Sequence, residues 1–217
     1  AITVINTCAS KAARTASRAC GEGPFQPVDL AISHFPGASQ WSFAGTKAYH
    51  TSVVLEGTEY CFRPEGIVGT PVGSSDRFDK PPSHVGKPKT RVFEVGLTRS
   101  HSDELVEKLD PFFQPGSYDL VNKNCNAFTD CALAFLLSRR LPRKYSAVER
   151  SGQSAPELLL SCASVGRYKV NASAAPFNLE AIILKVDANA WMGTAAVLDH
   201  FGDAPTTERC APDFDDG

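Results

Sequence analysis

A run of apolar residues between Cys125 and Pro142 constrains the fold more than any other feature of the sequence. Apolar side chains recur in it at helical spacing, and Leu133 and Leu137 widen the face that they form. Pro142 stops the pattern after two arginines, which suit the negative end of a helix. The pattern predicts a central, mostly buried helix. The recurring residues are Phe128, Cys131, Ala132, Phe135 and Leu136.

Several shorter segments are predicted to be β-strands, because they alternate apolar and polar residues or are rich in β-branched residues. Glu56-Gly57-Thr58 joins two of them as a β-hairpin. The stretch from Pro64 to Pro88 is full of Gly, Pro, Ser and Asp, and is expected to be a long surface loop. The strands are expected at Pro27 to Phe35, Tyr49 to Leu55, Glu59 to Phe62 and Arg91 to Leu97.

Two further helices are expected outside the central one. Ser102 is the predicted N-cap of a short helix through Leu109. A second helix is expected from about Pro156 to Val165, and an apolar segment from Phe177 to Val186 follows it. Strands and helices together indicate an α+β domain.

The composition is that of a globular protein and gives no sign of a nucleic-acid or membrane partner. The 217 residues are 42% hydrophobic and 21% charged, which excludes whole-chain disorder and a fibrous repeat. No apolar run approaches the roughly 20 residues that a membrane span needs. The formal net charge of −2 gives no electrostatic reason to expect nucleic-acid binding.

Charge is concentrated at the two ends of the chain. Residues 1–23 carry three basic residues against one acid, and residues 199–217 carry six acids against one arginine. Such ends are typical of solvated termini, or of tails that dock on a partner. The Ala- and Ser-rich, acid-poor beginning also resembles an organelle-targeting segment. We expect an intracellular protein, cytoplasmic unless this segment directs import into an organelle.

The seven cysteines are odd in number and include no C-x-x-C pair. This spacing signals neither a zinc site nor a thioredoxin-like motif, so we expect no metal and no cofactor. In a reduced intracellular chain, most of these thiols are small buried hydrophobic groups. Cys125 differs because it lies at the predicted first turn of the central helix, where Asn122 or Asn124 can act as the cap. Unpaired backbone N–H groups and the helix dipole favour a thiolate there, and the thiolate is the nucleophilic form.

A cysteine hydrolase also needs a base, and His50 suits this role best among the five histidines. It opens a predicted core strand against which the Cys125 helix would pack. On a period of two it shares a face with Ser52 and Val54. A helix N-terminus that faces a strand histidine is a workable geometry for a thiolate–imidazolium pair. The sequence contains no G-x-S-x-G elbow, P-loop or dinucleotide fingerprint, so phosphoryl and hydride transfer are poorly supported.

Two blocks of the sequence resemble those of the PPPDE thiol peptidases, a family that includes the desumoylating isopeptidases. The first is His-Thr-Ser-Val-Val-Leu-Glu-Gly-Thr-Glu-Tyr-Cys-Phe from His50, followed by Gly66-Ile67. The second begins at Tyr118-Asp119-Leu120, contains Asn124-Cys125-Asn126-Ala127-Phe128 and is followed by Leu141-Pro142. The resemblance implies a circularly permuted papain-like α+β fold, in which Cys125 is the nucleophile and His50 the general base of a dyad.

The mechanism that the resemblance implies is acyl transfer. Cys125 attacks an isopeptide or thioester carbonyl, His50 protonates the leaving group, and water then releases the thioester. An oxyanion hole is required, and the backbone N–H of Cys125 is its natural first donor. Asn124 and Asn126 are candidates for a second donor or for an orienting role, and helix capping is the alternative for both.

The chain departs from the family pattern in several places. In Phe62-Arg63-Pro64-Glu65-Gly66-Ile67, Arg replaces the small residue usual after Phe, and a Pro is added. Lys123 stands where relatives often carry His, and as a cation it would either stabilise the thiolate or be solvated. The resemblance covers residues 27–150. It leaves a basic N-terminal extension (residues 1–26) and a C-terminal extension with an acidic tail (residues 151–217).

The sequence therefore predicts a thiol hydrolase of the PPPDE type, which cleaves isopeptide bonds of ubiquitin-like modifiers or acyl thioesters of proteins. Its partners would be a ubiquitin-like modifier or an acylated protein. The alternative is a catalytically silent PPPDE-like domain that serves as a structural or adaptor subunit of a larger assembly, held through the extensions. A third hypothesis is that the chain is a relative of the lecithin:retinol acyltransferase group, whose permuted fold also bears an Asn-Cys block. The His-Thr-Ser-Val-Val block fits the PPPDE pattern better.

Overall fold

The computed structural model of the chain describes residues 3–4, 24–34, 48–75, 90–153 and 168–187. The strands in these residues form one antiparallel sheet with the order β1-β5-β4-β3-β2-β6. They are β1 (Thr3–Val4), β2 (Gln26–His34), β3 (Tyr49–Leu55), β4 (Thr58–Arg63), β5 (Gly66–Pro71) and β6 (Arg91–Thr98). An antiparallel sheet combined with helices confirms the predicted α+β class. The permuted papain connectivity stays a prediction.

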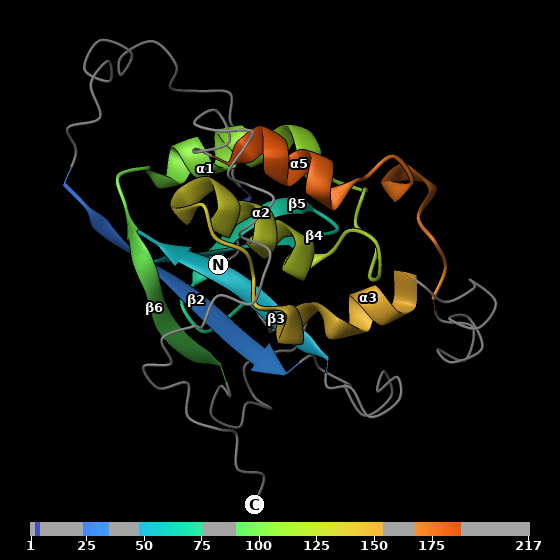
Figure 1. Cartoon of the computed structure of the whole chain (residues 1–217), viewed down its shortest axis with the longest axis horizontal. Coiled ribbons are helices and arrows are strands. Elements are labelled where there is room, and N and C mark those ends of the chain that lie inside the picture. The colour runs from blue at the N-terminus through green and yellow to red at the C-terminus, as the bar shows by residue number, and fades with distance from the viewer. Residues whose placement is uncertain (1–2, 5–23, 35–47, 76–89, 154–167, 188–217) are drawn as a thin grey trace, which may run out of the picture.

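The helices of the described residues gather on one side of the sheet, with α2 (Cys125–Leu137) in the centre (Figure 1). Helix α2 contacts β3, β4, α1 and α5. Most of its side chains are buried, which confirms the predicted central helix. It ends before Pro142, because Ser138 adopts a left-handed conformation with φ of 51°. The other helices are α1 (Ser102–Leu109), α3 (Ala147–Gln153) and α5 (Leu179–Val186), with 3₁₀ turns at Asp110–Phe112, Arg143–Ser146 and Ala172–Ala174.

The hairpin of β3 and β4 is confirmed, and β3 has the predicted bounds. Glu56 and Gly57 form its two-residue turn with φ of 53° and 73°. Positive φ at both positions matches the right-handed twist of the strands. The helix expected from Ser102 is also present, with His101 as its N-cap instead of Ser102. The helix predicted from Pro156 to Val165 lies outside the described residues.

The prediction of a loop throughout Pro64 to Pro88 was wrong for its first part. Gly66–Pro71 forms β5, which pairs with β4 along its whole length. The glycines suggested a turn, but Gly66 has φ of +104°, and a Cβ there would lie 3.2 Å from the Pro115 ring. Gly66 therefore allows close packing at the start of a strand whose Ile67 is buried. Residues 76–89 lie outside the described part of the chain.

Alternation along β3 sends successive side chains to opposite sides of the sheet. Thr51 is on the α2 side, where it hydrogen-bonds Asn126. His50 and Ser52 are on the other side, where they contact the Ser75 hydroxyl. Strand β3 therefore separates two buried environments. The core on the α2 side includes Leu30, Ile32, Val53, Leu55 and Phe128.

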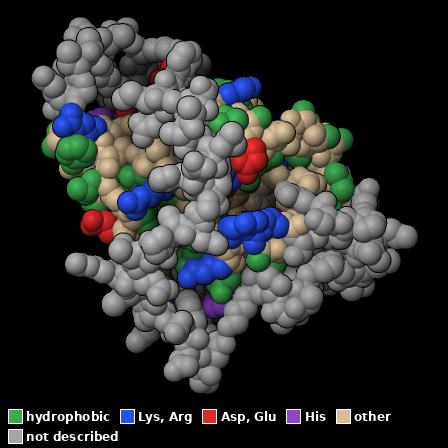
Figure 2. All heavy atoms as spheres, viewed as in Figure 1, with side chains coloured by type: hydrophobic (Ala, Val, Ile, Leu, Met, Phe, Trp, Pro, Cys, Tyr) green, Lys and Arg blue, Asp and Glu red, His purple; other side chains and the backbone are tan. Residues whose placement is uncertain are grey.

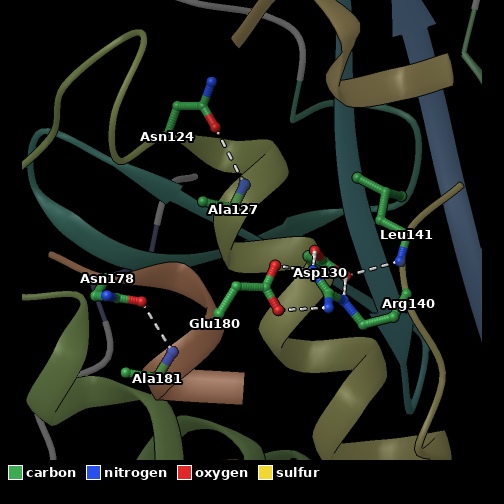
Figure 3. A network of polar contacts seen from close by, with 8 residues as sticks. All are labelled: Asn124, Ala127, Asp130, Arg140, Leu141, Asn178, Glu180 and Ala181. Atoms are coloured by element: carbon green, nitrogen blue, oxygen red, sulfur yellow. Dashed lines mark hydrogen bonds and ion pairs between the residues drawn. The ribbon is translucent and has the colours of Figure 1, made fainter. Parts of the chain in front are cut away.

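Arg140, just beyond α2, joins this helix to α5 (Figure 3). Its guanidinium donates to Asp130 of α2 at 2.9 and 3.0 Å and to both carboxylate oxygens of Glu180 at 2.8 Å. The Leu141 N–H donates to Asp130 at 2.8 Å. Helix α5, in the predicted C-terminal extension, is thus an integral part of the fold. Its side chains in the hydrophobic core are Ile182, Ile183 and Val186.

On the face shown in Figure 2, the Lys and Arg side chains of the described residues stand in separate groups among hydrophobic side chains and other atoms. Among the described residues, no helix combines the length and the apolar character that crossing a bilayer requires.

Candidate active site

Cys125 is the first residue of α2, as the sequence predicts. Asn124 is the N-cap, and its Oδ1 accepts a hydrogen bond from the Ala127 N–H at 3.1 Å (Figure 3). Its Nδ2 donates to the Leu120 carbonyl at 2.8 Å. For Asn124, the sequence left open an oxyanion or orienting role and helix capping; the structure confirms helix capping. The N–H of Cys125 belongs to the first turn, whose N–H groups have no acceptor within the helix.

The Cys125 thiol is buried, with 2% of the residue exposed. It donates to Asn126 Oδ1 at 3.8 Å. Burial raises the pKa of this thiol far above its ordinary value, and the negative charge of Glu149 raises it further. Hydrogen bonds from the N–H groups of Thr51 and Asn126 oppose the shift but do not reverse it. The structure therefore holds a protonated thiol where the sequence predicts a thiolate, because burial disfavours the charged form.

Asn126 connects the start of α2 to the strand that carries His50. Its Oδ1 accepts from the Thr51 N–H at 3.0 Å and from the Thr51 hydroxyl at 2.8 Å. Its Nδ2 lies 3.0 Å from the carbonyl oxygens of Tyr49 and Tyr145. Tyr49 and Thr51 flank His50, so one side chain next to Cys125 fixes the backbone on both sides of the histidine. The amide hydrogens of Asn126 are directed at protein acceptors.

Glu149 of α3 lies beside both asparagines that flank Cys125. Its Oε1 accepts from Asn126 Nδ2 at 2.5 Å and from Asn124 Nδ2 at 2.7 Å. Burial raises the pKa of Glu149, and the hydrogen bonds from both amides oppose this shift. Its Oε2 is buried without a hydrogen-bond partner among the described residues. Sequence reasoning missed Glu149, because only the tertiary fold brings α3 to the start of α2.

His50 is 1% exposed, and its Nε2 lies 2.8 Å from the Ser75 hydroxyl oxygen. Burial lowers the pKa of His50 to about 4; the charge of Glu59 opposes this shift and that of Arg63 adds to it. The ring is therefore neutral near pH 7. The structure gathers Asn124, Cys125 and Asn126 at the start of α2 and ties them to the backbone beside His50. The imidazole itself lies with Ser75, and its pairing with Cys125 stays a prediction.

A buried polar cluster surrounds the His50 ring. Glu59 Oε1 accepts from the hydroxyls of Ser52 and Ser75. The Arg63 guanidinium donates to the Ser75 carbonyl. Glu59 and Arg63 lie four residues apart on β4 and therefore face the same side of it. Glu59 begins the predicted strand and Arg63 follows directly after it, which was the available sequence signal for a buried polar face. Ser75 gave no such signal, because a pair of serines after a glycine is typical of a turn.

Lys123 is buried instead of solvated. Its ammonium donates to the Ser117 hydroxyl at 2.6 Å and lies 5.4 Å from the centre of the Phe177 ring, with two further phenylalanine rings nearby. Burial lowers the pKa of Lys123. Its charge is thus held in an aromatic pocket. Within the part of the chain that the structure describes, no group of three or more His, Cys, Asp or Glu side chains is arranged to hold a metal ion.

Comparison with known proteins finds curated relatives that match part of the chain. DeSI-like protein sdu1 of Schizosaccharomyces pombe is 29% identical over 116 residues, 52% of this chain and 57% of the relative. Desumoylating isopeptidase 1 of Homo sapiens is 30% identical over 98 residues, 43% of this chain and 53% of the relative. The Xenopus laevis protein of the same name is 28% identical over 98 residues, with the same shares covered. The chain thus spans just over half the length of the curated relatives that it matches.

The family model described as the PPPDE putative peptidase domain matches residues 28–163. This segment carries both blocks that suggested the resemblance, together with β3, α2 and the residues that surround Cys125 and His50. The chain belongs to the PPPDE putative peptidase family.

Proposed function

We propose that this chain is a cysteine-dependent hydrolase that cleaves isopeptide bonds of ubiquitin-like modifiers through Cys125 and His50. Family membership and the names of the desumoylating relatives support this reaction class. The observation that carries the proposal is the side chain of Asn126. It is adjacent to Cys125 and hydrogen-bonds both neighbours of His50. Residues 27–150 would carry the catalytic residues, and α5 of the C-terminal extension packs against this segment. Protein acyl thioesters are a second substrate class for the same chemistry.

In the proposed reaction, the Cys125 thiolate attacks the isopeptide carbonyl and forms a tetrahedral oxyanion. The Cys125 N–H, at the start of α2, is the proposed oxyanion donor. The His50 imidazolium then gives its proton to the departing lysine amine, and water hydrolyses the thioester with His50 as the base. Asn124 and Asn126 act as orienting residues, because their amide hydrogens already meet protein acceptors.

The resting protonation states define the first step of this mechanism. The thiol is protonated and the imidazole neutral near pH 7, since burial raises the pKa of Cys125 and lowers that of His50. The active ion pair is formed when the thiol proton passes to His50. Because Cys125 is 2% exposed, the substrate must also displace the groups that cover it.

The same burial favours a second candidate function, a catalytically silent domain that serves as an adaptor subunit. A thiol that remains covered and protonated would not react with a carbonyl. Under this alternative, the extensions would hold the domain in a larger assembly.

The two functions are separated by assaying the full chain on a SUMO–lysine-peptide isopeptide and on an acyl-thioester peptide. The hydrolase proposal expects turnover by the wild type and none by Cys125→Ser or His50→Gln. Cys131→Ser is the matched control, since Cys131 is a buried thiol of the same helix. Full activity of Cys125→Ser would refute the proposal. Absence of turnover in the folded wild type, with stable co-purification of a larger complex, would favour the adaptor.

A further inference from the structure

We propose that Ser75 and Glu59 are positioning residues for His50, which hold its ring with a proton on Nε2. The consequence for catalysis rests on the proposed function. The position of the proton and the role of the two side chains do not, because they follow from hydrogen bonds within the cluster.

The direction of each hydrogen bond follows from the carboxylate of Glu59, which can only accept. Its Oε1 contacts the hydroxyls of Ser52 and Ser75, so both hydroxyls can donate to it. Ser52 Oγ, 3.2 Å from Ser75 Oγ, is a weaker alternative acceptor for the Ser75 hydrogen. In either arrangement the Ser75 hydroxyl donates its only hydrogen to Glu59 or to Ser52. Its oxygen must then accept from His50 Nε2 at 2.8 Å, so Nε2 carries a hydrogen.

Two charged side chains of β4 fix the position of Ser75. Glu59 Oε2 accepts from the backbone N–H of Gly73 at 2.7 Å and of Ser74 at 3.1 Å, which shapes the turn after β5. Arg63 donates to the carbonyl of Ser75. Glu59, Arg63 and Ser75 are all buried. Arg63 is the residue that replaces the family's usual small side chain, and here it holds the serine that contacts His50.

This arrangement prepares His50 for the proton that the proposed reaction gives it. When the ring takes up the proton that the Cys125 thiol gives up in the proposed reaction, the sulfur becomes a thiolate and the ring an imidazolium. The positive ring then donates from Nε2 to Ser75, which relays to the negative Glu59. The charged groups that face the ring are Glu59, which favours the imidazolium, and Arg63, which opposes it. The proton leaves again with the amine, so the ring returns to the neutral Nε2–H form.

The test uses the full chain labelled with ¹⁵N-histidine, and two-bond ¹⁵N–¹H correlation spectra, which distinguish the two neutral tautomers. His50→Gln assigns the His50 signals by their loss. In the wild type we expect Nε2–H for His50. In Ser75→Ala we expect this tautomer to lose its dominance. Ser74→Ala is the control. The Ser74 hydroxyl lies in the same turn but donates to the Pro71 carbonyl, so its removal should leave the His50 spectrum unchanged.

Kinetics with the isopeptide substrate give the second readout. Ser75→Ala should lower kcat by about 10- to 100-fold with little change in KM, because a hydrogen bond to a charged group is lost. An Nδ1–H tautomer in the wild type, or an unchanged His50 spectrum in folded Ser75→Ala, would overturn the inference. If Ser75→Ala does not fold, the wild-type tautomer alone decides. The two proposals can also fail separately. If the wild type has no isopeptidase activity but its His50 is in the Nε2–H form, and this form is lost in Ser75→Ala, the positioning role is supported and the proposed function is refuted.

Discussion

The carboxylate of Glu149 lies 2.5 Å from the side-chain nitrogen of Asn126. The same oxygen also accepts from Asn124, so one atom joins the two residues that flank Cys125. Its negative charge is the largest contribution after burial to the raised pKa of the Cys125 thiol. Glu149 therefore orders the start of α2 and at the same time opposes ionisation of the cysteine that begins it.

Glu149→Gln should make Cys125 more reactive. The amide keeps an oxygen that can accept from Asn124 and Asn126, but it removes the negative charge that raises the pKa of the thiol. The thiolate fraction at a given pH then increases, and so does the rate of alkylation. Iodoacetamide labelling between about pH 7 and pH 9, followed by peptide mass spectrometry, measures this rate for each cysteine.

Cys131 is the internal control for this experiment. It lies in the same helix, and its pKa is raised by burial and then by Asp130, with no contribution from Glu149. Its labelling rate should not change in Glu149→Gln. Equal labelling of Cys125 in the variant and the wild type would show that Glu149 does not govern the thiol.

Asn126→Ala should destabilise the fold more than removal of an ordinary helix cap. The variant removes the hydrogen bonds that Asn126 makes with the Thr51 N–H and the Tyr49 carbonyl, and we expect a loss of about 2–3 kcal/mol in the free energy of unfolding. Asn178→Ala is the matched control, since Asn178 caps α5 through a single bond to Ala181, and it should cost about 1 kcal/mol. Urea denaturation measures both. Equal losses would mean that Asn126 acts only as a local helix residue.

The elements of the fold were predictable where the local pattern carries the information. The period of α2, the cap at Asn124 and the turn at Glu56-Gly57 each depend on residues that are close in sequence. The β5 strand was not predictable, because Gly66 allows close packing against Pro115, and the sequence does not reveal this contact. A glycine in a turn and a glycine under a neighbouring ring look the same in one sequence.

The site was predictable in part for the same reason. The helix start at Cys125 and the strand that carries His50 follow from local patterns and from the family blocks. The ionisation state of the thiol depends on burial and on Glu149, which only the packed structure supplies. Ser75 reaches His50 because Glu59 and Arg63 shape a turn beyond β5, and no spacing rule encodes such a contact.

Arg140→Ala should loosen the attachment of α5 to α2. The variant removes the hydrogen bonds from Arg140 to the mostly buried Asp130 carboxylate, which keeps the bond from the Leu141 N–H. It also removes both bonds to Glu180. We expect a loss of about 1–3 kcal/mol in the free energy of unfolding and faster amide hydrogen exchange in α5. Arg139→Ala is the control, because Arg139 donates only to the Val95 carbonyl of β6 among these contacts. Unchanged exchange in α5 would show that its apolar side chains alone hold the helix.

The buried, neutral His50 ring should make stability depend on pH below neutrality. Burial lowers the pKa of His50 to about 4 in the folded protein, against 6.5 for the exposed side chain. Between these values the unfolded chain binds the proton and the folded chain does not, so acidification favours unfolding. The contribution is complete above about pH 6.5, falls as the pH decreases to about 4, and changes no further below it. The loss is on the order of 3 kcal/mol.

Urea denaturation at a series of pH values measures this dependence in the wild type and in His50→Gln. The variant has no imidazole at this position, so the part of the slope between about pH 6.5 and pH 4 that comes from His50 should disappear. His101→Gln is the comparison variant, because the His101 side chain is 43% exposed whereas His50 is 1% exposed. The same slope in His50→Gln and the wild type would mean that His50 binds a proton in the folded protein as readily as in the unfolded chain. The buried cluster around Ser75 would then have to accommodate an imidazolium already at rest.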